Sequence, residues 1–341
     1  MSYLLLVLSF AVILAGALLF TNAVEWIGHR LQLGEGAVGS VLAAVGTAMP
    51  ETLIAIVALI GAKQGADQVA IGAIVGAPFL LGTLAMGLVG LFAYLYRERR
   101  AQGLELRAHR ETLERDLLFF LAFFALSLAL AWGPPAALRF PVGVLALLAY
   151  PLYIRRTLAR GGDVQDHGTL DPLIFERRPE RRMSPGLGVS VIQLLVGLGA
   201  MVGGAHLFVD ELLKIASDLG VEAVVLALIL APLATELPEK VNSFFWVREG
   251  KDSLALGNIT GAMVFQAAIP TSVALLFAPE TWVAGPGSYL AFTSAGIAFL
   301  SSAAIFLPMV RSGRLRGRGL LIGGAFYVAY LVIVGVGIAS S

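Results

Sequence analysis

The chain contains no cysteine and few charged residues. Without cysteine, neither disulfide bonds nor thiolate metal sites can form. Asp, Glu, Lys and Arg make up only 14% of the 341 residues, whereas hydrophobic residues make up 58%. This composition is too apolar for a water-soluble domain of ordinary type. We therefore expect most of the chain to lie in a lipid bilayer.

Histidine is also scarce, and this bears on catalysis. The four histidines are His29, His109, His167 and His206. Their spacing matches no metal-binding motif, and the apolar segments contain no nucleophile paired with a base. The sequence thus predicts neither an enzyme nor a bound cofactor.

Long uncharged stretches recur along the chain. A helix needs about 20 residues to cross a bilayer core, and residues 68–96 and 183–209, for example, contain no Asp, Glu, Lys or Arg. The expected fold class is therefore an all-α integral membrane protein with about ten transmembrane helices. The predicted spans cover residues 3–28, 36–61, 67–96, 116–133, 137–154, 187–214, 221–246, 252–278, 287–308 and 319–339.

The basic residues are divided unequally between the two sides of the predicted membrane. If the helices cross alternately, twenty basic residues fall in the connections on one side, against Lys63, Arg139 and Lys214 on the other. The positive-inside rule then predicts that the basic side is cytoplasmic and that both termini lie outside. The lack of long soluble domains favours a prokaryotic plasma membrane.

The two halves of the chain share a sequence pattern. Met49-Pro50-Glu51 matches Leu237-Pro238-Glu239 at an offset of 188 residues, and the same offset places Thr47 on Thr235. Matches at this offset also relate the first predicted helix to the sixth. One fixed offset across two pairs of helices indicates an internal repeat.

The repeat predicts the organisation of the chain. Five helices precede the second copy of the pattern, and because five is odd, the halves must enter the membrane in opposite directions. We expect two inverted five-helix repeats, residues 1–155 and 187–341, joined by a solvated cytoplasmic linker over residues 156–186. Inverted repeats of this kind place the substrate site near the bilayer midplane, where the halves meet.

Two glutamates lie deep in predicted helices. Glu51 is about 22 Å along its helix, within a core about 30 Å thick, and Glu239 repeats its position. Such carboxylates are costly unless they meet a wet cavity, a cation or a proton. Pro50 and Pro238 should disrupt the helices and free carbonyl groups next to these acids. Carboxylate, hydroxyl and carbonyl oxygens are the ligands that a hard cation such as calcium requires.

Other polar residues are candidates of lower rank. Glu236 lies on much the same helix face as Glu239, and it is either a third ligand or the partner of Lys240. Gly72 and Gly76 are four residues apart, as are Gly257 and Gly261, a spacing that should allow close helix packing. Such packing would bring the Asn258 amide oxygen into the site. The remaining intramembrane polar residues are interpreted as helix ends, packing or cavity lining: Asn22, Glu25, His206, Asp210 and Gln266.

The motifs around the two glutamates resemble those of a known family. The stretch from Gly46 to Glu51 and its partner from Ala234 to Glu239 resemble the alpha repeats of the sodium/calcium exchanger family, within the cation/calcium exchanger superfamily. The segment from Gly257 to Gly261 resembles the second part of that motif. The resemblance implies that Glu51 and Glu239 are central calcium ligands, that Thr47 and Thr235 contribute beside them, and that sodium is the counter-ion in alternating-access transport.

The chain also departs from the family pattern. Family members commonly have serine at the positions of Ala48 and Glu236, and polar residues at the positions of Ala77-Pro78 and Ala262-Met263; an asparagine expected at Ala73 is missing too. Because these positions help to build the ion sites, sodium coordination should be weakened most. Sodium/calcium exchange is the leading hypothesis. The alternatives are proton-coupled exchange of calcium or another cation, a passive cation pathway, and a protein that binds a cation without transporting it.

Overall fold

The chain is mostly helical. The computed structural model describes residues 1–30, 43–61, 63–108, 110–133, 135–159, 171–178, 185–285, 288–312 and 315–340. The first part comprises α1 (Ser2–Arg30), α3 (Ala43–Gly61), α4 (Ala66–Leu80), the π-helix η2 (Leu81–Ala85), α5 (Met86–Leu95), β1 (Glu105–Leu106), α6 (Arg110–Ala129), the short η3 (Ala136–Leu138) and α7 (Arg139–Ala159). The second comprises α8 (Leu187–Leu219), α9 (Ala223–Arg248), α10 (Asp252–Phe277), the short η5 (Pro279–Thr281), α11 (Tyr289–Ser312), β2 (Leu315–Arg316) and α12 (Gly317–Ser340).

These helices suit a bilayer. Six are long and apolar enough to cross one, over Ser2–Arg30, Ala66–Leu95, Ala136–Thr157, Leu187–Leu219, Ala255–Phe277 and Tyr289–Met309. The expectation of a mostly helical chain with helices long and apolar enough to span a bilayer is therefore confirmed. The number of membrane crossings and the inverted repeat stay predictions.

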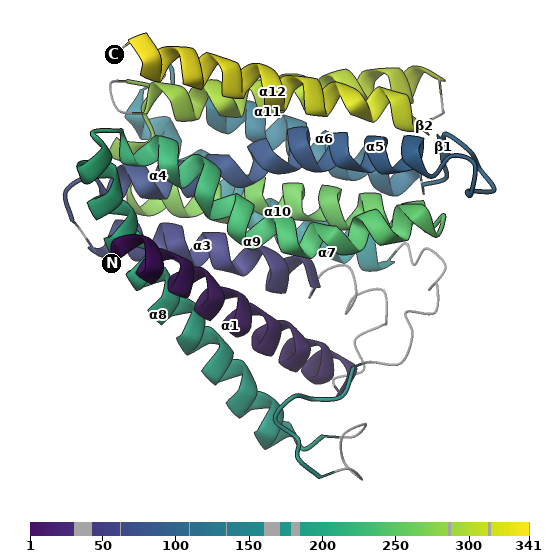
Figure 1. The fold of residues 1–341 in the computed structure, drawn as a ribbon, viewed down its shortest axis with the longest axis horizontal. Coiled ribbons are helices and arrows are strands. Elements are labelled where there is room, and N and C mark those ends of the chain that lie inside the picture. Colours follow the sequence, from purple (N-terminus) through teal and green to yellow (C-terminus); the bar gives the residue numbers. More distant parts are fainter. Residues whose placement is uncertain are drawn as a thin grey trace.

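α1 and α8 form a closely packed pair. In Figure 1 they lie side by side and slant away from the other helices, which run roughly parallel to one another. A Cβ atom added at Gly16 of α1 would lie 2.8 Å from the Gly197 carbonyl oxygen of α8, and one at Gly204 would lie 2.7 Å from the Ile13 side chain. The absence of side chains at these glycines thus lets the two backbones meet.

Part of the predicted linker contacts α1 and α8. The Asp171 carbonyl accepts a hydrogen bond from Trp26 Nε1 of α1 at 2.9 Å, and the Phe175 N–H donates to Gln193 Oε1 of α8 at 2.8 Å. Leu173 is almost completely buried. Polar side chains of α1 and α8 thus anchor the backbone of residues 171–178, while five of these eight residues remain exposed; the linker over residues 156–186 stays a prediction. Asn22 takes part, since its Oδ1 accepts from the Ile174 N–H at 3.1 Å.

α4 runs through the centre of the protein and packs against α9. Its residues are almost all buried. A Cβ atom at Gly76 would lie 2.6 Å from the Leu228 carbonyl oxygen, and one at Gly72 would lie 2.8 Å from the Val224 carbonyl oxygen. The packing role predicted for these two glycines is therefore confirmed. Among the described residues, none would lie within 4 Å of a Cβ at Gly257.

The crowded surroundings of Gly76 and the open surroundings of Gly257 predict unequal effects of replacing each glycine by alanine. Gly76→Ala should lower the free energy of unfolding by about 1–3 kcal/mol, because the obstructing atom belongs to the α9 backbone and cannot rotate away. Gly257→Ala is the matched control and should cause no loss, since alanine also has the higher helix propensity. Thermal unfolding of both variants in detergent would measure this. Equal midpoints for the two variants would contradict the packing argument.

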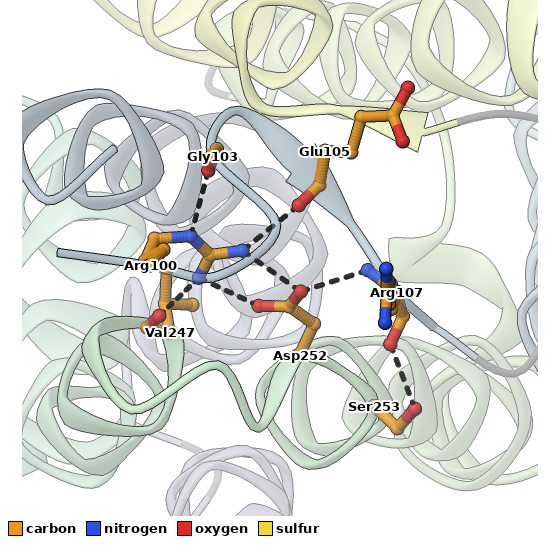
Figure 2. Close-up of polar contacts among 7 residues, drawn as sticks. All are labelled: Arg100, Gly103, Glu105, Arg107, Val247, Asp252 and Ser253. Atoms are coloured by element: carbon orange, nitrogen blue, oxygen red, sulfur yellow. Dashed lines mark hydrogen bonds and ion pairs between the residues drawn. The ribbon is translucent and has the colours of Figure 1, made fainter. Parts of the chain in front are cut away.

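A buried ion pair joins the loop after α5 to the start of α10. Arg100 binds Asp252 through two contacts of 2.9 Å, and both side chains are fully buried. Figure 2 shows that the guanidinium also donates to the carbonyl oxygens of Gly103, Glu105 and Val247, while the Arg107 N–H donates to Asp252 Oδ2. Nearby, β1 pairs with β2 in an antiparallel ribbon. The connections that carry these arginines therefore meet at one end of the molecule, called here the arginine-rich end.

Candidate ion-binding site

The candidate site begins where α3 meets α9. Glu51 of α3 and Thr235 of α9 are both buried, with exposed fractions of 1% and 0%. The Thr235 hydroxyl donates a hydrogen bond to Glu51 Oε1 and also lies 2.8 Å from the Ala231 carbonyl oxygen. The fold thus brings together two of the predicted site residues, although 184 positions separate them in the sequence.

Glu236 adds a second buried carboxylate beside Thr235. Its side chain is fully buried, and Gln266 Nε2 of α10 donates to its Oε1 at 3.4 Å. Three helices, α3, α9 and α10, therefore contribute polar side chains to this region. The alternative pairing of Glu236 with Lys240 stays open, because the Lys240 side chain lies outside the described part of the structure.

The remaining predicted ligands have different outcomes. The side chains of Thr47 and Glu239 lie outside the described residues, so their roles stay predictions. Asn258 is described, and its Nδ2 donates to Ser243 Oγ of α9 at 3.1 Å. On α10 it precedes Gln266 by about 12 Å of helix. Its role as a ligand likewise stays a prediction.

Gln266 is a polar residue that the sequence does not mark as a ligand. It is fully buried and contacts Glu236, which agrees with the predicted role in packing or cavity lining and also brings it to the candidate site. One signal in the sequence could have identified it. Pro270 follows four residues later and lacks the N–H that would bind the Gln266 carbonyl, which instead accepts from the Thr271 hydroxyl at 3.1 Å.

The prolines near the glutamates do not break their helices. α3 continues through Pro50, and α9 runs unbroken from Ala223 to Arg248 across Pro238. The expectation of broken helices is therefore wrong. A membrane helix tolerates proline because neighbouring groups and small adjustments satisfy the freed backbone. Each proline still removes one N–H from the ladder, so carbonyl oxygens near the glutamates lack one helical donor.

The chemistry of this site is that of oxygen ligands. Glu51 and Glu236 offer carboxylates, Thr235 a hydroxyl and Gln266 an amide oxygen, and hard cations such as calcium and sodium prefer such donors. No group of three His, Cys, Asp or Glu side chains that could hold a metal occurs among the described residues. The arrangement is suited to binding a cation between helices.

Comparisons with known proteins agree with this chemistry. The family model described as "Sodium/calcium exchanger protein" matches residues 1–158 and 189–336. The sodium/calcium exchanger MaX1 of Methanosarcina acetivorans is 25% identical in an alignment that extends over 366 residues, gaps included, and covers 98% of each chain. Two solved structures share the fold. An H+/Ca2+ exchanger, CAX, has a TM-score of 0.72 at 17% identity, covering 98% of this chain and 81% of its own. The sodium-calcium exchanger NCX_Mj has a TM-score of 0.57 at 20% identity, covering 98% of both chains.

Proposed function

The chain belongs to the sodium/calcium exchanger family, and from this premise we propose that it is an integral membrane antiporter that exchanges calcium for sodium by alternating access. The contact between Glu51 and Thr235 carries the proposal, because it joins the two parts of the chain that match in sequence. The transported ion binds there to carboxylate and hydroxyl oxygens. The activity is transport, without chemical conversion of a substrate.

The proposed ligands come from both halves of the chain. Glu51 and Glu239 are the central carboxylates, and Thr47, Thr235, Glu236 and Asn258 supply further oxygens. The described contact of Gln266 with Glu236 supports adding its amide oxygen to this set. The halves, residues 1–155 and 187–341, are inverted relative to each other and joined by the linker over residues 156–186. The site between the two halves is then open alternately to the two sides of the membrane.

The arginine-rich end is proposed to face the cytoplasm. Arg100 and Arg107 lie there beside Asp252, and the pairing of β1 with β2 brings Arg316 to the same end. Cytoplasmic connections of membrane proteins carry an excess of arginine and lysine. Both termini then lie on the outer side, in a prokaryotic plasma membrane.

A second candidate function is proton-coupled calcium exchange. It is favoured by Glu236, an additional buried carboxylate where family members commonly have serine. It is also favoured by the apolar positions Ala73, Ala77 and Pro78 on α4, which are all buried and offer no side-chain oxygen to sodium. A carboxylate can carry the proton itself, so this mode of exchange requires fewer ligands.

Radiolabelled calcium uptake into proteoliposomes separates these functions. We expect uptake by the wild-type protein when a sodium gradient is imposed. Uptake driven only by a proton gradient would assign the second function, and uptake that needs no counter-ion gradient would indicate a passive pathway. If neither gradient nor passive conditions produced uptake, calcium exchange would be contradicted, and cation binding without transport would remain.

A further inference from the structure

A further buried carboxylate, Asp116, lies outside the candidate ion-binding site. It is on α6, near the arginine-rich end, and its exposed fraction is 2%. The Tyr153 hydroxyl of α7 donates to Oδ1 at 2.7 Å, and the Thr260 hydroxyl of α10 donates to Oδ2 at 2.8 Å. One carboxylate therefore joins three helices. We call Asp116, Tyr153 and Thr260 the Asp116 cluster.

A positively charged side chain, that of Arg115, lies beside this cluster. Arg115, the residue before Asp116, approaches its Oδ1 at 3.4 Å, and its guanidinium carbon lies 5.3 Å from the centre of the Tyr153 ring. The arginine thus shields the cluster and supplies a compensating charge. Hydrogen bonds to a charged acceptor are stronger than neutral ones, so the two hydroxyls hold their helices firmly to α6.

The Asp116 cluster is connected to the ion site through α10. Thr260 precedes Gln266 by six residues, or about 9 Å of helix. Gln266 in turn contacts Glu236. A helix is stiff over such a distance. The hydrogen bond from Thr260 to Asp116 therefore sets the position and rotation of α10, and with them the place at which Gln266 meets the Glu236 carboxylate.

A second connection runs through α7 to α3. Tyr150, one turn before Tyr153, packs in a buried cluster with Phe265 of α10 and Ala48 of α3. The Tyr150 and Phe265 ring centres are 5.6 Å apart. Ala48 is three residues before Glu51. The Asp116 cluster therefore supports the helices on both sides of the ion site, and apolar residues could have packed them without the cost of burying a charge.

We propose that Asp116 is a positioning residue for ion binding. Through Tyr153 and Thr260 it holds α7 and α10 at the spacing that lets Glu51, Glu236 and Gln266 bind the same cation. The inference rests on the proposed function, since it concerns affinity at that site. Asp116 itself does not touch the ion.

Single-atom changes in the cluster test this proposal. Asp116→Asn keeps the size of the side chain but removes its charge, Tyr153→Phe removes one hydroxyl, and Thr260→Val replaces a hydroxyl by a methyl group. Thr260→Ser retains the hydroxyl and is the matched control. Calcium uptake into proteoliposomes is measured over a range of calcium concentrations, with the gradient that drives the wild type.

We expect KM for calcium to rise about tenfold in Asp116→Asn and Thr260→Val, the factor that corresponds to losing a hydrogen bond to a charged group. Tyr153→Phe should also raise KM. The KM of Thr260→Ser should stay within about twofold of the wild-type value. The double variant of Asp116→Asn and Thr260→Val should raise KM by less than the product of the two single effects, because both changes weaken the same contact between Asp116 and Thr260.

The measurement separates positioning from a purely structural role. If the cluster only maintained the fold, the variants would lower the maximal rate through loss of folded protein while KM stayed unchanged, and the proposal would be overturned. An unchanged rate and KM in all variants would also overturn it. The proposed function fails separately, in the wild type, if neither gradient produces calcium uptake.

Discussion

Calcium exchange should fall at least about 30-fold when Glu51 is replaced by glutamine, because removing one charge from a buried, hydrogen-bonded ion contact costs about 2–5 kcal/mol. Glutamine has nearly the same shape, and its amide oxygen can still accept the hydrogen bond that Thr235 donates to Glu51. The fold should therefore be retained while the cation loses a carboxylate ligand. Uptake of radiolabelled calcium into proteoliposomes measures the effect.

The control for this prediction is the same substitution at an exposed glutamate. Glu249 pairs with Lys251, and both side chains are more than half exposed, so Glu249→Gln should transport at the wild-type rate. Glu239→Gln tests the repeat and should lose transport as Glu51→Gln does. Retention of more than about a tenth of the wild-type rate by Glu51→Gln would show that Glu51 is not a central ligand.

Asp252→Asn should lower the free energy of unfolding by about 3–5 kcal/mol, the usual cost of removing one partner of a buried ion pair. Both carboxylate oxygens of Asp252 face the Arg100 guanidinium (Figure 2), and both side chains are fully buried. Asparagine would present an amide N–H2 group to a cation and leave its charge uncompensated. Unfolding in mixed detergent micelles measures the loss.

The control for this second prediction is an ion pair in contact with solvent. Lys63 of the loop after α3 pairs with Asp210 of α8, and their side chains are 53% and 39% exposed. Asp210→Asn should cost less than about 1 kcal/mol, because water screens the interaction. If the two Asp→Asn variants lost the same stability, burial of the Arg100 and Asp252 pair would not be the cause.

Much of the candidate site could be predicted before the fold was known. Glu51 and Thr235 were both identified from the repeat, and the structure places their side chains in contact. Glu51 is conspicuous in the sequence because a carboxylate in an apolar segment is costly, and its role as an ion ligand stays a prediction. Gln266 carries no charge and was ranked low, although it is as deeply buried as Thr235 and Glu236.

The sequence by itself indicated that the chain lies in lipid, where its helices are, and which two motifs repeat. Its long apolar stretches can be stable only as helices in lipid, since backbone groups must be satisfied within each segment. The tertiary structure alone decided which polar groups meet: Arg100 with Asp252, Asp116 with Tyr153 and Thr260, Glu236 with Gln266, and the linker with α1 and α8. Most of these partners are far apart in the chain. Their contacts depend on the rotation, height and tilt of packed helices, which the pattern along one helix does not specify.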